Sequence, residues 1–268
     1  MLKGAQHGKD NEIFGKFGLA FEDYATGILR RMCPSRPGLF DRVAYHLGGA
    51  DARGNEFEID ASLIDVSQSV VFEMKAAWLR EDAMIDDMPD RLLADIRAKY
   101  GVDPKRKGER PKGVAQLARS VGAIARGEWL GPNAEFAHST TFYPVLVVHD
   151  TRLDTPALGH FLDGEFMGLL GTIPSGKRVA PLTIMTVQDL ENLESSVANF
   201  SFVELLDAYS RECPDRLRSL HNFIAYSDFS KQILPSSYLL EGSQQVLELL
   251  KDELFPGLDV PLPADRVL

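Results

Sequence analysis

The chain of 268 residues is long enough to bury a large hydrophobic interior, and its 44% hydrophobic and 25% charged residues are typical of a globular protein. Its net charge of −10 argues against general coating of nucleic acid, which needs a basic surface, but leaves room for a local basic strip. The two cysteines, Cys33 and Cys213, lie far apart and form no disulfide or zinc pattern. A polar start and no long apolar run favour a cytoplasmic protein without a membrane segment.

The first part of the chain predicts a helix followed by strands. Residues 1–11 are polar and are expected to be a flexible start. From residue 12 to 32, aromatic and aliphatic residues recur three and four apart, which predicts an amphipathic helix. Three strands are expected from apolar runs bounded by turn residues, at 39–47, 56–66 and 69–76.

The rest of the chain predicts helices around two further strands. Residues 80–98 are acidic and helical, with an interruption at Pro89, and a helix resumes at Gly113. The residues between 151 and 178 are expected to be mostly loop or short helix. The remaining elements are buried strands at 140–149 and 180–186 and a helical region at 201–255.

Three charged residues interrupt the apolar strands in the centre of this pattern: Asp60, Glu73 and Lys75. Because side chains alternate across a strand, Glu73 and Lys75 are expected on one face, and a hairpin would bring Asp60 close to them. Burying such charges is costly unless they neutralise one another or hold a cation. The sequence therefore predicts a charged site inside the sheet.

Oxygen ligands of this kind suit a hard divalent cation such as Mg²⁺ or Mn²⁺, which often takes only one or two carboxylates. Asp60 and Glu73 would supply the carboxylates, and the backbone carbonyl of Met74 is placed for a third oxygen. Lys75 would support an attacking water or neutralise charge on a phosphate. The pattern is typical of phosphodiester hydrolysis.

A strand with Asp60 followed by an apolar strand that ends in Glu73-Met74-Lys75 resembles the PD-(D/E)xK nuclease superfamily. The resemblance covers residues 12–150 and implies an α/β, restriction-endonuclease-like core, with the order helix, three-stranded meander, helix and strand and a mixed central sheet. It further implies that Glu22 on the first helix assists the metal and that Gln116 orients Lys75 or the phosphate. One departure is Ile59, which stands where the motif has proline.

Simpler structural interpretations stay open for each of these residues. Glu73 and Lys75 are also compatible with a salt bridge at a strand end, and Asp60 with a turn cap. Glu22 is compatible with a solvated helix position. Gln116 is equally compatible with a purely structural position on its helix.

A basic stretch at residues 99–112 leads into the helix of Gln116 and is expected to be a mobile surface loop. Its cations are candidates for contacts with nucleic-acid phosphates, or a solvated charged loop. An acidic protein with one such strip is expected to bind nucleic acid weakly on its own. The candidate residues are Lys99, Lys105, Arg106, Lys107, Arg110 and Lys112.

Together these features predict a nuclease core at 12–190, with the basic insertion, and a helical region at 195–268 packed on it. The expected activity is Mg²⁺- or Mn²⁺-dependent hydrolysis of DNA, by an endonuclease rather than an exonuclease, with RNA as the alternative substrate. The resemblance also suggests a bacterial or phage defence role, and a homodimer or a larger complex. The competing hypothesis is an inactive member of the same fold that binds nucleic acid or serves assembly.

Overall fold

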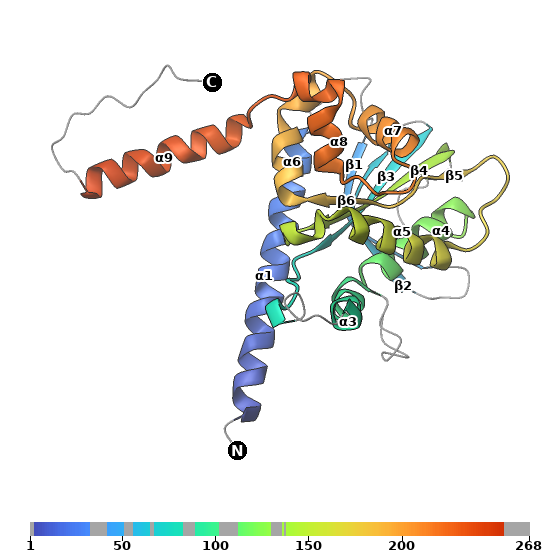
Figure 1. Cartoon of the computed structure of the whole chain (residues 1–268), viewed down its shortest axis with the longest axis horizontal. Helices are drawn as coiled ribbons and strands as arrows, with labels where there is room; N and C mark the ends of the chain where they lie inside the picture. The colour runs from blue at the N-terminus through green and yellow to red at the C-terminus, as the bar shows by residue number, and fades with distance from the viewer. Residues whose placement is uncertain are drawn as a thin grey trace.

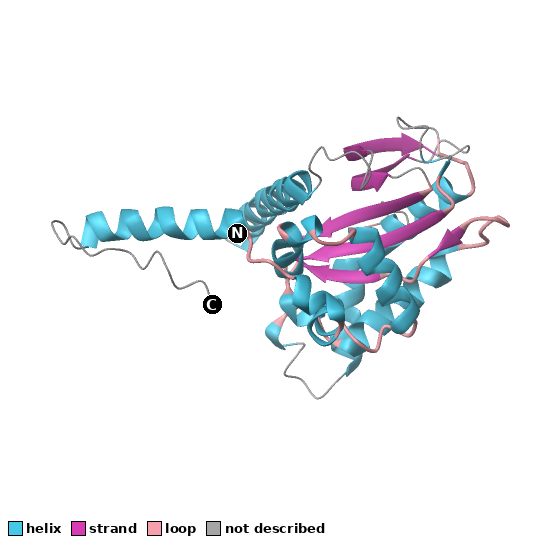
Figure 2. Ribbon diagram, turned by 90° about the horizontal axis from the view of Figure 1, so that it is seen from above, coloured by secondary structure: helices cyan, strands magenta, loops and turns pink. Residues whose placement is uncertain are grey.

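The computed structural model describes residues 3–32, 42–50, 56–64, 67–82, 89–101, 112–129, 136 and 138–254. These residues form an α/β fold in which helices cover both faces of a mixed central sheet (Figures 1 and 2). The strands are β1 (Arg42–Ala50), β2 (Glu56–Ile64), β3 (Gln68–Lys75), β4 (Thr141–Val148), β5 (Arg178–Val179) and β6 (Thr183–Thr186).

The first three strands form an antiparallel meander, and β3 then pairs with β4 in parallel. Both β5 and β6 pair in parallel with β4, so β4 lies in the interior of the sheet. Seven of the eight residues of β4 are buried, as expected for a strand covered on both faces. The strand predicted from this apolar run is therefore confirmed.

Two hydrophobic cores lie on opposite faces of the sheet. One is formed with α1, α6, α7 and α8, and the other with α3, α4 and α5. The helix bounds are α1 (Lys3–Met32), α3 (Pro89–Tyr100), α4 (Val114–Ala125), α5 (Pro156–Leu170), α6 (Val187–Glu194), α7 (Phe202–Glu212), α8 (Leu220–Tyr226) and α9 (Ser237–Leu254). Short 3-10 helices occupy Thr151–Leu153, Ser196–Ala198 and Asp228–Gln232.

The helical region expected near the C-terminus is present, and its α7 and α8 contribute to the core beside α1. Helix α9 projects away from the rest of the molecule in both views (Figures 1 and 2). None of the helices in the described residues is long and apolar enough to cross a membrane.

Several element boundaries differ from those expected. Helix α1 begins at Lys3 rather than at residue 12, so the start predicted to be flexible continues the helix. Pro89 begins α3, where its missing N–H is not needed. Lys99 lies within α3 rather than in the basic loop. The interval expected to be mostly loop contains the 15-residue helix α5.

Candidate active site

The candidate site lies where β2 and β3 separate. Their antiparallel pairing runs from Ile64 opposite Ser69 to Ala61 opposite Phe72 and stops there. The next position would place Asp60 opposite Glu73. Instead, the side chain of Asp60 replaces a backbone carbonyl as the hydrogen-bond acceptor. Its Oδ2 accepts a hydrogen bond of 2.6 Å from the Met74 N–H.

The pairing of β1 with β2 is also interrupted at Asp60. Tyr45 pairs with Ala61 and Leu47 pairs with Ile59, but His46 and Asp60 do not pair. His46 has a φ of 47°, which is uncommon for a residue other than glycine. Leu47 and Ile59 then belong to the core beside α4, whereas Ala61 belongs to the core beside α1. At the position of Asp60, both strands thus switch the sheet face toward which their alternate side chains point.

Glu73 and Lys75 lie on the same face of β3, as the alternation of side chains predicted. The Lys75 Nζ is 2.6 Å from Glu73 Oε1, and the same oxygen accepts a hydrogen bond of 3.2 Å from the N–H of Gly113. Gly113 caps the N-terminus of α4, where the helix dipole favours a negative charge. Glu73 is 1% exposed and Asp60 is 6% exposed, so both acids are buried.

Gly113 is required at this position by its backbone. Its φ is 54°, and a Cβ atom would lie 2.2 Å from the carbonyl oxygen of Tyr100. The end of α3 therefore packs directly against the start of α4, beside Glu73. Sequence reasoning placed the helix start correctly but did not identify Gly113 as a partner of Glu73; a glycine at a predicted helix start was the available signal.

Burial and mutual charge shift the pKa of each ionisable group in the site. Burial raises the pKa of Glu73 to about 8, because the attraction of Lys75 only partly offsets it and Asp60 adds repulsion. Burial likewise raises the pKa of Asp60, against the opposing effects of Lys75 and the Met74 N–H. Burial alone would lower the pKa of Lys75, but Glu73 and Asp60 outweigh it and raise the pKa.

Glu22 on α1 belongs to the same electrostatic neighbourhood. It is half-buried, and burial followed by repulsion from Asp60 raises its pKa, while Lys75 and His46 oppose the rise. The carbonyl of Met74 points to the side of β3 on which Asp60 lies, because the N–H and C=O of one strand residue share a side. Asp60 and the Met74 carbonyl thus lie on the same side of β3.

The remaining predicted site residues have other partners, are exposed, or lie outside the described residues. The Nε2 of Gln116 donates a hydrogen bond of 3.1 Å to the Glu58 carbonyl oxygen of β2, which ties α4 to that strand. Lys99 pairs with Asp95 at 2.9 Å, and Lys112 is exposed. The remaining basic candidates lie outside the described residues: Lys105, Arg106, Lys107 and Arg110.

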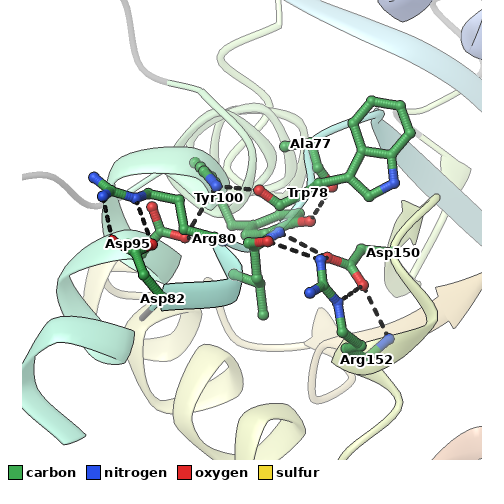
Figure 3. Close-up of polar contacts among 10 residues, drawn as sticks. Ala77, Trp78, Arg80, Asp82, Asp95, Tyr100, Asp150 and Arg152 are labelled. Atoms are coloured by element: carbon green, nitrogen blue, oxygen red, sulfur yellow. Dashed lines mark hydrogen bonds and ion pairs between the residues drawn. The ribbon is translucent and has the colours of Figure 1, made fainter. Parts of the chain in front are cut away.

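The backbone that follows Lys75 is fixed by polar contacts from α3 and from the loop after β4 (Figure 3). These contacts bind the peptide groups of residues 77–80 on both sides, so this short connection is held without regular secondary structure. They are Tyr100 Oη to the Ala77 carbonyl at 2.7 Å, Lys99 Nζ to the Trp78 carbonyl, Leu79 N–H to Asp150 Oδ2 at 2.7 Å, Arg152 Nη2 to the Leu79 carbonyl at 2.7 Å and Arg80 N–H to Asp95 Oδ2 at 2.8 Å.

Across the residues for which coordinates are described, no three His, Cys, Asp or Glu side chains come close enough together to hold a metal ion. Glu22, Asp60 and Glu73 are thus not close enough to form such a group. Mg²⁺ accepts as few as one or two carboxylates when waters and substrate oxygens complete its shell. In comparisons with known proteins, no family model, no curated protein and no solved structure matches the chain.

Proposed function

We propose that the protein is a metal-dependent nuclease that hydrolyses phosphodiester bonds, with DNA as its main substrate. The observation that carries the proposal is the convergence of Asp60, Glu73 and Lys75 at the point where β2 and β3 separate. Burying two carboxylates beside one ammonium lowers the stability of the fold. Such a group is explained if it binds a cation and a phosphate.

The order of elements supports the same proposal. A long helix, an antiparallel meander, the two helices α3 and α4 and a parallel strand follow one another along the chain. The resemblance to PD-(D/E)xK nucleases implies the same order with one helix between the meander and the strand. Glu22 from α1 reaches the neighbourhood of the acids from the first helix, where that superfamily places an acid. The role of Gln116 in orienting Lys75 or phosphate remains part of the proposal.

The donor set fits Mg²⁺ or Mn²⁺ held by Asp60, Glu73 and the Met74 carbonyl. When bound, such a cation lowers the pKa of a water and polarises the phosphoryl oxygen. Lys75 would then release Glu73 and stabilise the negative charge that develops on the phosphate. Glu22 would order a water beside the acids.

The proposal includes an endonuclease mode of cutting, a cytoplasmic location and a role in bacterial or phage defence. RNA is the alternative substrate. A homodimer or a larger complex would supply the affinity for nucleic acid that a chain of net charge −10 lacks. The basic residues from Lys99 to Lys112 would contribute phosphate contacts.

One observation favours a second candidate function, an inactive nucleic-acid-binding or assembly module. Glu73 Oε1 is already held by Lys75 and by the Gly113 N–H. A site that served only stability or binding would keep such an internal ion pair. The two functions differ in whether Lys75 is needed for cleavage.

The test is cleavage of supercoiled plasmid and of single-stranded DNA and RNA in Mg²⁺ or Mn²⁺. We expect the wild-type protein to cut DNA, Lys75→Ala to lose at least about 100-fold of the rate, and EDTA to stop the reaction. Lys231→Ala is the matched control, because Lys231 is exposed and pairs only with Asp228 in the described structure. Binding without cutting by both the wild type and Lys75→Ala would instead support the inactive module.

A further inference from the structure

An aromatic cluster lies next to the candidate site, and the function proposed above does not use it. The rings of Trp78 and Phe17 stack with centroids 4.6 Å apart and an angle of 28°. His149 meets both rings edge-on, at 4.9 Å from Trp78 and 5.2 Å from Phe17. Phe21, one turn further along α1, meets His149 in the same way at 5.8 Å.

Trp78 is held rigidly and yet remains open to solvent. Its carbonyl accepts a hydrogen bond from Lys99, and the peptide groups before and after it are bound by Tyr100 and Asp150. Its ring points away from this polar network (Figure 3). Trp78 is nevertheless 38% exposed and counts among the exposed large hydrophobic residues.

The cluster follows the candidate site directly along the chain. Trp78 follows Lys75 by three residues, so the Cα atoms of the two residues are roughly 10 Å apart at most. His149 follows β4 directly, and its N–H donates a hydrogen bond of 3.3 Å to the carbonyl of Lys75. At ~3.4 Å per base along a strand, the backbone separation of Lys75 and Trp78 corresponds to about three nucleotides.

We propose that Trp78, backed by Phe17 and His149, is a stacking platform for an unpaired nucleobase of the strand whose phosphate lies at Asp60, Glu73 and Lys75. This inference rests on the proposed function and adds a substrate class, single-stranded or frayed nucleic acid. An aromatic face gives each stacked base a favourable contact whatever its sequence. A fully paired duplex keeps its bases stacked internally and offers none to the indole.

The experiment uses a protein with a single tryptophan, made by Trp129→Phe, because the chain contains two tryptophans. Titration with a 12-nucleotide oligo(dT) in calcium buffer, with the strand checked for cleavage on a gel, should quench Trp78 fluorescence. Trp78→Ala should weaken binding of the oligonucleotide about tenfold or more, and Trp78→Phe should restore most of it. Affinity for a blunt duplex should not change.

Two controls separate stacking from general effects. Leu19→Ala removes an apolar side chain of α1 that is 65% exposed and that takes no part in the ring contacts of the cluster. It should leave the affinity unchanged. An oligonucleotide with abasic sites should bind the wild type as weakly as normal oligo(dT) binds Trp78→Ala, since the stacked base is then missing.

Unchanged fluorescence together with equal affinities of the wild type and Trp78→Ala would overturn the inference. So would a dimer that becomes a monomer in Trp78→Ala while DNA binding stays the same, because the indole would then be an interface between two copies. If the wild type cuts DNA but Trp78 plays no part, the proposed nuclease stands and this inference falls. If Trp78 is quenched but no cutting occurs, the platform stands and the nuclease falls.

Discussion

Glu73 is the most deeply buried acid of the site, and its surroundings determine the pH dependence expected of the folded protein. Its pKa rises from an ordinary value of 4.5 to about 8 because burial disfavours the charged carboxylate more than Lys75 stabilises it. Between pH 4.5 and 8 the folded state therefore keeps a proton that the unfolded state has lost. Asp60 and Glu22 have pKa values raised in the same direction.

We accordingly expect the free energy of unfolding to fall as the pH rises from about 5 to 8 in the absence of metal. Glu73→Gln should remove the part due to Glu73, which amounts to at most ~1.4 kcal/mol per pH unit. Urea unfolding at several pH values in EDTA measures both slopes. Glu204→Gln, at an exposed position of α7, should keep the wild-type slope, and equal slopes for wild type and Glu73→Gln would contradict the account.

His46 is the residue whose conformation sequence reasoning did not anticipate. A regular strand was expected at His46. Instead, its backbone φ is 47° and it does not pair with Asp60. After this position, the side chains of both strands alternate onto the opposite faces of the sheet. No pattern of apolar residues signals such a change, because it depends on how two strands share one irregular position. The identity of Asp60 was visible in the sequence, whereas its hydrogen bond to Met74 was not.

At the scale of elements, the connection between β3 and α3 depends on Asp150. This buried carboxylate accepts hydrogen bonds from the Leu79 N–H and from two guanidinium nitrogens of Arg152, each at 2.7 Å. The Arg152 guanidinium in turn binds the Leu79 carbonyl. Through these bonds the loop after β4 fixes the backbone next to Trp78.

Asp150→Ala should lower the free energy of unfolding by about 3 kcal/mol, since it leaves a buried N–H and a guanidinium without their acceptor. It should also reduce oligo(dT) binding, because Trp78 would lose its fixed backbone. Asp228→Ala removes an exposed acid paired with Lys231 and should change stability by less than ~0.5 kcal/mol. Urea unfolding checks both values, and equal effects of the two substitutions would exclude a special role for Asp150.

The secondary-structure elements that could be predicted from the sequence are those whose burial gives a clear apolar pattern. Strand β4 was predicted correctly because a buried central strand is apolar throughout. Helix α5 was not, because its three internal glycines lower helix propensity. The helix forms because residues four apart are buried against the sheet, and such packing outweighs propensity. These residues are Leu158, Leu162, Phe166 and Leu170.

At the scale of the whole molecule, the C-terminal helices share a core with the strands that carry the site. Phe72 of β3 and Phe202 of α7 are both fully buried, and their rings stack with centroids 6.1 Å apart. The same core includes residues of α1 and α8. Helices α7 and α8 of the predicted helical region are thus packed on the sheet and are expected to unfold with it, whereas α9 projects from the rest of the molecule.

Phe202→Ala should lower the free energy of unfolding by about 4 kcal/mol through the cavity that it leaves. The loss should appear in a single transition that coincides by tryptophan fluorescence and by circular dichroism. Val246→Ala is the control, because this side chain of the projecting helix α9 is 54% exposed and its loss should matter little. Two separate transitions would show that the helices form an independent unit.

We propose that Asp60 and Glu73 hold a divalent cation at the end of the β2–β3 pairing. Anomalous diffraction from crystals soaked in Mn²⁺ tests it most directly, with Asp60→Asn crystals as the control. We predict a manganese peak about 2 Å from one carboxylate oxygen of each acid, reduced or absent in Asp60→Asn. Wild-type crystals without a peak, in which Glu73 stays paired with Lys75 and Asp60 with the Met74 N–H, would contradict it.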